Sequence, residues 1–237
     1  MGKKALLSQG KEKYVHGVFS EIAPFYESMN HLLSFNLDRV WRRRALDRFF
    51  RVTHRQILDL CCGTGELTEQ LRQRVGPDGS IVGVDFCEQM LEVAMHRHSG
   101  VANIAYRTGN ARDLAFQSRS FDAVYLGFAL RNLDDTYAVF KEIQRVTKPG
   151  GQIVALEFTL PHLVLFRWYL THIVPTIGRV FQGKTSPYNY LADSIRCFYT
   201  PQQLRDRFVA EGLVEVEYEE YFGGLVTAIS STVGVGD

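Results

Sequence analysis

The hydrophobic positions along the chain form short apolar runs that alternate with stretches of helical periodicity. The apolar runs predict five strands, at residues 56–60, 80–85, 103–108, 121–128 and 152–158. Amphipathic helical spacing lies between them, at residues 66–75, 87–98 and 136–147. Two later strand-like runs, 213–221 and 225–230, flank Gly223-Gly224 and predict an antiparallel pair at a sheet edge. The pattern therefore predicts an α/β fold, with a doubly wound, mostly parallel seven-stranded sheet and helices on both faces.

Two helical segments lie outside this alternation. We expect residues 1–50 to form an N-terminal helical cap or lid on an α/β domain of residues 51–237. The most apolar stretch, 163–181, falls in a helical insertion at about residues 160–205. Two arginines, a histidine and a proline interrupt it, so it is a poor candidate for a membrane-spanning helix. It is better suited to cover a site or to lie against a membrane.

The composition is that of an ordinary globular protein, with 46% hydrophobic and 22% charged residues among 237. The net charge of +1 gives no reason to expect nucleic acid as a partner. Basic residues gather over 38–55, which predicts either a solvated helix face or a surface for anionic lipid or an anionic ligand. The four cysteines form no C-x-x-C pair, so we expect no zinc site and a reducing, cytoplasmic environment. Cys61 and Cys62 suit a tight turn as small apolar residues.

The turn after the first predicted strand carries the clearest signal for a ligand. In a doubly wound sheet, ligands bind beyond the carboxyl ends of the strands, where the strand order reverses. Gly63 and Gly65 lie in that turn and lack Cβ atoms, so a ligand can approach the backbone closely. Asp85 ends the second predicted strand, and its carboxylate can accept hydrogen bonds from both hydroxyls of a ribose. We therefore predict that a nucleoside cofactor binds here.

Two cofactor classes contain such a ribose. A nicotinamide dinucleotide favours the sequence G-x-G-x-x-G, but Thr68 stands in place of the third glycine and Glu66 puts negative charge where phosphates would lie. S-adenosylmethionine has no phosphate, and its positive sulfonium suits acidic neighbours such as Asp59 and Glu66. Asn110 follows the third predicted strand. Its side chain either contacts the adenine or caps its own turn, and the residues leave both open.

Other stretches are specific enough to compare with known families. The segment "YESMNHLLSFNLDRVW" (26–41) is similar to the signature Y-D-x-M-N-x-x-x-S-x-x-x-H-x-x-W of class I methyltransferases that C-methylate quinone precursors in menaquinone and ubiquinone biosynthesis. The segment "RVTKPGGQIVALEFT" (145–159) is similar to their R-V-L-K-P-G-G…L-E-F-S segment, and "LRNL" (130–133) and "YNYLADSIRCFYTPQQL" (188–204) also resemble family blocks. Glu27 and Asp38 depart from the signature, which has Asp and His there. Cys61-Cys62 stand where the family usually has small residues such as Ala-Gly.

The resemblance implies a class I (Rossmann-like) methyltransferase that uses S-adenosylmethionine. The expected cofactor-binding residues, from the turn chemistry and the resemblance together, are Asp59, Gly63, Thr64, Gly65, Asp85, Asn110 and Ala111. The implied reaction is methylation of a ring carbon of a reduced, prenylated quinone precursor, with demethylmenaquinol as the first choice. A benzoquinol of ubiquinone biosynthesis and demethylphylloquinol of phylloquinone biosynthesis remain alternatives.

Methylation of a ring carbon requires a neighbouring hydroxyl to lose its proton, which a base or a cation would assist. Arg131 and Asn132 follow the fourth predicted strand and are our candidate catalytic residues. Arg131 cannot act as a base. It can stabilise a phenolate or orient a water that takes the proton, and the alternative is a salt bridge with Asp134 or Asp135. No metal is expected to take part. The resemblance and the position in the chain suggest a set of substrate-binding residues, for which packing within the cap is the alternative: Tyr26, Asn30, Tyr188, Tyr190 and Arg196.

A prenylated acceptor would reach the enzyme from a membrane. We expect residues 14–55 and 163–181 to cover the site as a lid. We also expect Arg42, Arg43 and Arg44 to hold the protein peripherally on anionic lipid at the inner face of the membrane. The alternative is that both segments pack on each other or form a homodimer contact. A nicotinamide-dependent oxidoreductase and a non-catalytic scaffold of a quinone-biosynthesis complex are the alternatives from other functional classes.

Overall fold

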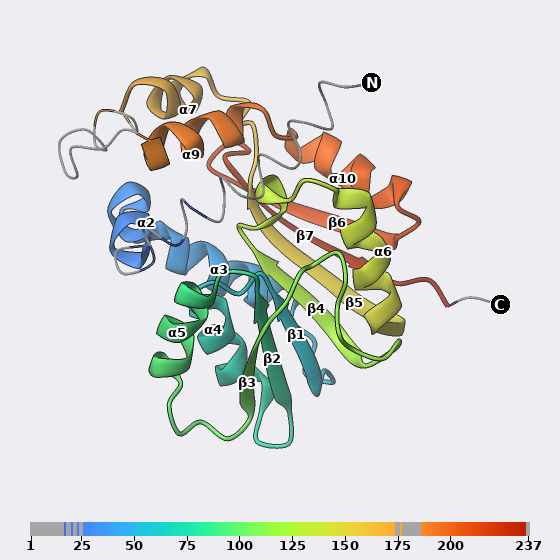
Figure 1. Cartoon of the computed structure of the whole chain (residues 1–237). Helices are drawn as coiled ribbons and strands as arrows, with labels where there is room; N and C mark the ends of the chain where they lie inside the picture. Colours follow the sequence, from blue (N-terminus) through green and yellow to red (C-terminus); the bar gives the residue numbers. More distant parts are fainter. Residues whose placement is uncertain are drawn as a thin grey trace, which may run out of the picture.

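The computed structural model describes residues 17, 20, 23, 26–173, 176 and 186–235. Most of the expected helix before residue 26, and the greater part of residues 174–185, lie outside the described residues. Figure 1 shows a single sheet with helices on both of its faces and a further group of helices at one end. The class I architecture expected from the sequence is therefore confirmed.

Seven strands of the described chain form one sheet in the order β3-β2-β1-β4-β5-β7-β6. The parallel strands are β1 (Gln56–Leu60), β2 (Ser80–Asp85), β3 (Ile104–Thr108), β4 (Phe121–Gly127) and β5 (Thr147–Phe158). The last two strands, β6 (Val214–Tyr221) and β7 (Val226–Thr232), form the expected antiparallel pair. Strand β7 returns between β5 and β6 and pairs with both, so β6 is the edge strand. The strand order reverses between β1 and β4, which places the ligand site of such a sheet at their carboxyl ends.

Helices cover both faces of the sheet and bury it in two hydrophobic clusters. Helices α3 (Leu37–Phe49), α4 (Glu66–Val75) and α5 (Glu88–Arg97) pack on one face, and α6 (Thr136–Val146) and α10 (Pro201–Ala210) pack on the other (Figure 1). The buried residues of α4, Leu67, Leu71 and Val75, recur at the spacing of one helix face. Helix α3 buries Trp41 and Leu46 in the same cluster, so this part of the expected cap is built into the core.

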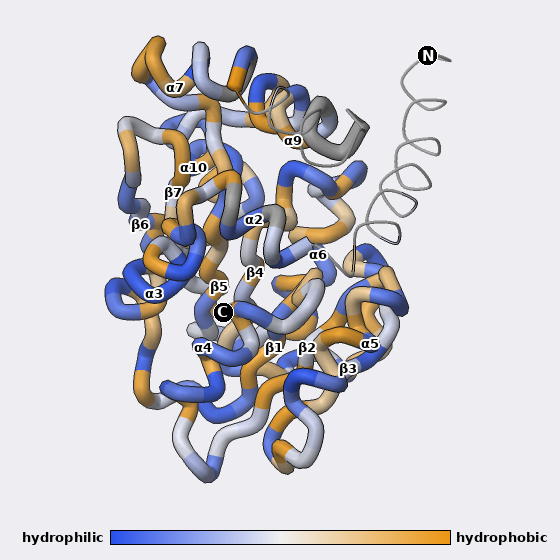
Figure 2. Tube along the Cα trace, turned by 90° about the vertical axis from the view of Figure 1, so that its left-hand side faces the viewer, coloured by the Kyte–Doolittle hydropathy of each residue, from blue (hydrophilic) through white to orange (hydrophobic). Residues whose placement is uncertain are grey.

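A cap of helices lies at the carboxyl ends of the strands (Figure 1). It contains α2 (Tyr26–Ser34), α7 (Val164–Trp168), η3 (Tyr169–Ile173) and α9 (Ser186–Arg196). The Tyr169 hydroxyl donates to the carbonyl oxygen of Leu33 over 3.1 Å, so the insertion after β5 contacts α2. Figure 2 shows hydrophobic residues along α7, and two of them, Val164 and Leu165, are 78% and 68% exposed. None of the helices in the described ranges combines the length and apolar character needed to cross a bilayer.

Candidate active site

The turn between β1 and α4 has a backbone conformation that favours glycine. Cys61, Gly63 and Gly65 have positive φ angles of 56°, 55° and 79°. A Cβ atom on Gly63 would meet nothing within 4 Å, and this residue borders a cavity. A Cβ atom on Gly65 would lie 2.6 Å from the hydroxyl of Tyr106 on β3. Gly63 therefore leaves space beside the cavity. Gly65 instead leaves space for the Tyr106 side chain, a contact that the sequence did not indicate.

Asp85 holds this turn in place. Its Oδ2 accepts a hydrogen bond from the backbone N–H of Gly63 over 2.8 Å, and its Oδ1 accepts one from the N–H of Cys87 over 2.9 Å. The residue is buried at the end of β2 and lines the cavity beside Gly63. A carboxylate offers about four acceptor positions, so it can also receive ligand hydroxyls from the cavity side. Asp85 thus organises the turn at the place where a ribose is expected.

Asp59 is a buried carboxylate behind the same turn. Its Oδ2 accepts a hydrogen bond from the Thr68 hydroxyl over 2.5 Å, whereas its Oδ1 is buried without a hydrogen-bond partner among the described residues. Burial is the main cause that raises the pKa of Asp59 to about 7, against the opposing effect of the Thr68 hydrogen bond. A buried acceptor without a donor is costly, so this site is suited to a ligand that brings a donor or a positive charge.

The turn opens into a first cavity that contains about 880 Å³ of empty space, including part of the open mouth. Its walls bring together six of the expected site residues: Tyr26, Gly63, Asp85, Asn110, Ala111 and Asn132. The side-chain oxygen of Asn110 accepts a hydrogen bond from the backbone N–H of Arg112 over 3.0 Å, so Asn110 does cap its own turn. A smaller neighbouring cavity, of about 350 Å³, is bordered by Asp59, Thr64 and Glu66.

A second large cavity, with about 580 Å³ of empty space, adjoins the first. Tyr26 and Phe128 line both cavities. The second cavity is mostly apolar and aromatic, with walls that include Leu33, Trp41, Phe128, Phe158, Tyr169, Leu191, Ile195 and Leu225. Its polar groups come from Asn30, Ser34, Asp38, Arg42 and Arg131, and Tyr26 and Tyr169 add hydroxyls. A flat apolar molecule with a few polar substituents matches this lining.

Arg131 and Asn132 lie in a short 3₁₀ helix, η2 (Leu130–Asn132), between the two cavities. The Arg131 guanidinium donates to Glu157 on β5 over 2.5 Å and to the carbonyl oxygen of Phe128 over 2.7 Å. The sequence did not indicate Glu157 as a partner. Asn132 lines the first cavity, and its side-chain oxygen accepts a hydrogen bond from Tyr190 of α9 over 2.9 Å. The pair of candidate catalytic residues is thus connected both to the sheet and to the cap.

The remaining expected substrate-binding residues have different surroundings. Tyr26 lines both large cavities, and burial raises the pKa of its hydroxyl, which keeps it protonated. Asn30 is a hydrogen-bond partner of Tyr26 and lines the second cavity. Arg196 is exposed, lies 3.8 Å from Asp193, and is not among the residues that line these cavities. The side chain of Tyr188 lies outside the described part of α9.

The two adjacent cysteines are not poised for nucleophilic chemistry. Burial and the carboxylates of Asp59 and Asp85 raise the thiol pKa of both Cys61 and Cys62 well above its usual value. A thiol in this state stays protonated, and the thiolate is the reactive form. Cys61 and Cys62 therefore serve as small residues in the turn, as the sequence predicts.

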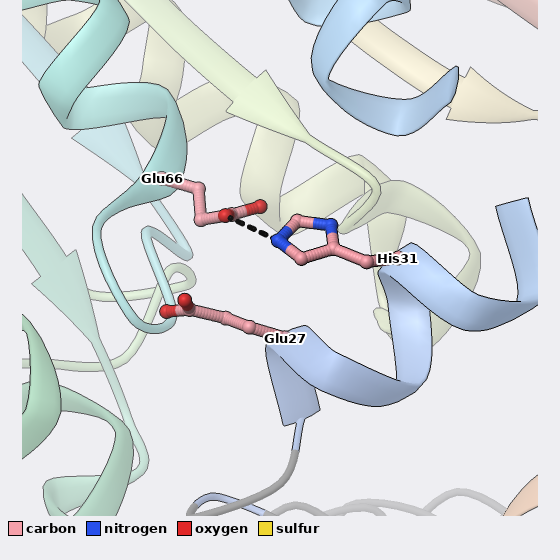
Figure 3. Close-up of side chains that lie close together, drawn as sticks. All are labelled: Glu27, His31 and Glu66. Atoms are coloured by element: carbon pink, nitrogen blue, oxygen red, sulfur yellow. Dashed lines mark ion pairs between the residues drawn. The ribbon is translucent and has the colours of Figure 1, made fainter. Parts of the chain in front are cut away.

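An ionic network that the sequence did not reveal joins the cap to α4. His31 on α2 faces Glu66 on α4 over 3.2 Å (Figure 3). Arg42 on α3 contacts Glu66 over 3.1 Å and Asp38 over 2.6 Å. Arg42 is only 5% exposed, which corrects the expectation that it faces anionic lipid. The i,i+4 spacing of Asp38 and Arg42 was the one sequence signal for this pairing.

The same network contains three potential metal ligands. Atoms of Glu27, His31 and Glu66 lie within 4.8 Å of one another (Figure 3). Arg42 contacts Glu66, and Arg97 forms an ion pair with Glu27. Positive guanidinium groups thus neutralise the carboxylates that a metal ion would need. We interpret the cluster as an ion-pair network that fastens the cap.

Comparison with known proteins gives a consistent result. The family model described as the ubiE/COQ5 methyltransferase family matches residues 7–233. A demethylmenaquinone methyltransferase of Lactococcus lactis subsp. lactis (strain IL1403) is 38% identical over 232 residues, which is 95% of this chain and 92% of the relative. One of Geobacillus stearothermophilus is 39% identical over 225 residues, which is 92% of this chain and 96% of the relative.

Solved structures resemble the chain in fold. A SAM-dependent methyltransferase of Thermotoga maritima superposes with a TM-score of 0.68 at 20% identity, covering 92% of this chain and 98% of the other. A SAM-dependent methyltransferase of Aquifex aeolicus gives a TM-score of 0.65 at 15% identity, covering 87% and 97%. At these identities the likeness is one of fold.

Proposed function

The chain belongs to the ubiE/COQ5 methyltransferase family and is therefore a SAM-dependent methyltransferase, and we propose that it methylates a ring carbon of a prenylated demethylmenaquinol. The observation that carries this proposal is the pair of adjoining cavities. One is built around Asp85 and the glycine turn, and the other is lined by aromatic and aliphatic side chains. Such a pair suits a nucleoside donor beside a flat, apolar acceptor.

The residues of the first cavity suit S-adenosylmethionine. Asp85 would bind the ribose hydroxyls, and Asn110 and Ala111 would lie beside the adenine. The buried Oδ1 of Asp59 has no hydrogen-bond donor among the described residues, so a charged ammonium or sulfonium would satisfy it, and Gly63 and Thr64 would form the adjacent wall. The bound cofactor supplies a methyl group on a positively charged sulfur. The acidic character of this turn is compatible with that charge and not with a pyrophosphate.

The second cavity would hold the acceptor ring. The ring would pack between aromatic residues such as Trp41 and Phe158, and its hydroxyl groups would meet the polar residues of the wall. Arg131 keeps its positive charge at all ordinary pH values and can stabilise a phenolate oxygen that forms beside it. Its ion pair with Glu157 holds the guanidinium in one orientation. Tyr26, which stays protonated, can donate a hydrogen bond at the junction of the two cavities.

The identity of the quinone can be tested directly. Purified protein would be incubated with S-adenosylmethionine and one of three reduced acceptors with short tails of equal length: a demethylmenaquinol with an unsaturated prenyl tail, a demethylphylloquinol with a mostly saturated tail, and a demethylated benzoquinol with an unsaturated prenyl tail. Mass spectrometry would detect the gain of one methyl group. We expect the naphthoquinols to be methylated faster than the benzoquinol, because the second ring fills more of the apolar cavity. Faster methylation of the benzoquinol would contradict the proposed acceptor.

We also propose that the cap covers the site and that α7 touches the membrane from which the acceptor comes. Exposed apolar side chains gather on and beside α7, at Leu163, Val164, Leu165 and Trp168. The following residue, Tyr169, lines the acceptor cavity, so the apolar surface leads to the site. Exposed Arg43 and Arg44 remain available for anionic lipid, whereas Arg42 is not.

Vesicle co-sedimentation tests the membrane contact. The double variant Leu165→Ser, Trp168→Ser should bind anionic vesicles less than the wild type, and should keep its activity on a short-tailed acceptor. Val52→Ser is the matched control, because Val52 is 77% exposed and precedes β1 at the opposite end of the strands. If the wild type never sediments with the vesicles at low salt, the membrane contact is wrong. Gel filtration would then decide whether the α7 surface is a homodimer contact.

A further inference from the structure

His31 lies between two carboxylates that belong to different elements. Its Nδ1 is 3.1 Å from both carboxylate oxygens of Asp38 on α3. Its Nε2 is 3.2 Å from Oε1 of Glu66 on α4, the contact drawn in Figure 3. The side chain of His31 is 15% exposed, and its Nε2 atom is itself buried. The imidazole thus bridges carboxylates of α3 and α4.

Asp38 connects His31 to the acceptor cavity. Its side chain is buried, and it is the only carboxylate among the described residues that line this cavity. Its Oδ1 accepts a hydrogen bond from the Ser34 hydroxyl over 2.7 Å, and its Oδ2 accepts one from Arg42 over 2.6 Å. Burial alone would raise the pKa of Asp38, but Arg42, Ser34 and His31 outweigh burial and lower it. The cavity wall therefore carries an ionised carboxylate that is held in position.

The other polar groups of this cavity are poor proton acceptors. Arg131 and Arg42 remain charged, and an arginine has no acceptor atom. Burial raises the pKa of Tyr26, so its hydroxyl keeps its own proton. Asn30 and Ser34 are neutral at every ordinary pH. Burial also raises the pKa of Tyr169, so Asp38 is left, among the described residues of the wall, as the group that can receive a proton from a ring hydroxyl.

The charged surroundings of His31 come from four helices. They are Glu27 on α2, Asp38, Arg39 and Arg42 on α3, Glu66 on α4, and Arg97 on α5. Both positions at which the chain departs from the family signature, Glu27 and Asp38, belong to this set. A carboxylate in place of the usual histidine at position 38 thus has an imidazole beside it. This arrangement brings a histidine and a carboxylate together at the acceptor cavity.

We infer that Asp38 and His31 form the proton-accepting pair for the ring hydroxyl of the acceptor, an inference that rests on the proposed function. Asp38 is the catalytic residue of the pair, because its carboxylate lies on the wall of the cavity where the ring hydroxyl would bind. His31 is a positioning residue whose Nδ1 lies within hydrogen-bond distance of Asp38 and takes the proton onward.

The step balances without an oxidant or a metal ion. The O–H bond of the acceptor breaks, its proton passes to Asp38 and then to His31, and the freed electron pair raises the electron density of the adjacent ring carbon. That carbon forms a bond to the methyl group as the bond between methyl and sulfur breaks, and that electron pair stays on sulfur. The ring then loses the hydrogen at the methylated carbon while its oxygen regains a proton. One proton in total leaves through His31.

The test compares the pH dependence of turnover in the full-length enzyme at saturating cofactor. The wild-type kcat/KM for a short-tailed demethylmenaquinol should fall as the pH is lowered, since solvent protons then compete for the accepting pair. His31→Gln should lower kcat by about 10²-fold and abolish this dependence on pH. His162→Gln is the matched control, because His162 also faces a carboxylate, Glu220 over 3.2 Å, but on the exposed surface away from the cavities. It should leave both kcat and the pH profile unchanged.

Variants of Asp38 give an independent measurement. Asp38→Asn should lower kcat at least as much as His31→Gln, and Asp38→Glu should restore part of the rate. His31→Gln leaves the ion pair of Asp38 and Arg42 in place, so it serves if the Asp38 variants do not fold. Normal kcat with a wild-type pH profile in His31→Gln would overturn the inference. If the wild type methylates none of the quinols, the proposed function fails instead.

Discussion

Cofactor binding should release a proton from Asp59. In the unliganded protein the buried carboxyl has a pKa of about 7, and its Oδ1 has no hydrogen-bond donor among the described residues. The positive end of S-adenosylmethionine would favour the ionised form and lower the pKa. The cofactor therefore binds well only when Asp59 has lost its proton. Below about pH 7, that loss has to accompany binding.

The size of the effect follows from the pKa of Asp59. About one half of the carboxyl groups are ionised at pH 7, and about 3% at pH 5.5. Affinity for the cofactor should therefore fall by roughly tenfold between these pH values, which corresponds to on the order of 1–2 kcal/mol. The number of protons released per cofactor should be about 0.5 at pH 7 and close to one at pH 5.5. The ammonium group of the cofactor stays charged over this range.

Isothermal titration calorimetry measures both quantities. Titrations in buffers with different heats of ionisation give the number of protons released from the slope of the heat. Asp59→Asn should bind more weakly, with an affinity that does not vary between about pH 5.5 and 7. Asp122→Asn is the control, because Asp122 lies at the amino end of β4 and its pKa is lowered below this range. Wild-type affinity that is constant over the range, with no dependence of the heat on the buffer, would refute the reasoning.

Three further variants test the rest of the site. Asp85→Ala should abolish measurable cofactor binding, with a loss of binding free energy on the order of 2–4 kcal/mol. It should also lower the melting temperature, because the carboxylate holds the turn. Unchanged affinity in calorimetry would contradict this. Arg131→Lys should lower kcat and kcat/KM together while cofactor affinity stays within about twofold, since a lysine lacks the planar guanidinium that pairs with Glu157. Normal turnover would show that Arg131 is a structural residue. Gly65→Ala should lower the free energy of unfolding by about 1–3 kcal/mol, measured by chemical denaturation. Adding Tyr106→Phe should recover part of this stability, because it removes the hydroxyl that the new Cβ would contact. Equal stability of Gly65→Ala and the wild type would show that the turn adapts.

The parts of the fold that sequence reasoning found are those with a local signal. Alternating apolar runs and helices specify parallel strands, and the reversal of strand order at β1 then places the turn at Gly63 and the carboxylate of Asp85 at one edge. The Gly-Gly turn likewise predicts the pairing of β6 with β7. The turn does not indicate that β7, and not β6, pairs with β5, because either strand of a hairpin can add to a sheet.

Ion pairs between distant elements had no local signal. Arg131 has acidic neighbours in the chain, yet the structure pairs it with Glu157, 26 residues away on β5. His31 and Glu66 meet only because the cap folds over the start of α4. The basic run around Trp41 has the composition of an exposed surface, but Arg42 lies on the buried side of α3 beside these carboxylates. Which arginine of such a run is buried depends on packing against other elements, which periodicity does not record.

Tyr26 is a wall residue of both large cavities, and this has a consequence for how the enzyme handles its two ligands. One ring with a face in each cavity cannot change its position for one ligand without changing the space offered to the other. Coupling of this kind is reciprocal, so the factor by which a bound donor tightens the acceptor equals the factor by which the acceptor tightens the donor. After methyl transfer, the same side chain lies beside both products, so the release of one product changes the affinity of the enzyme for the other.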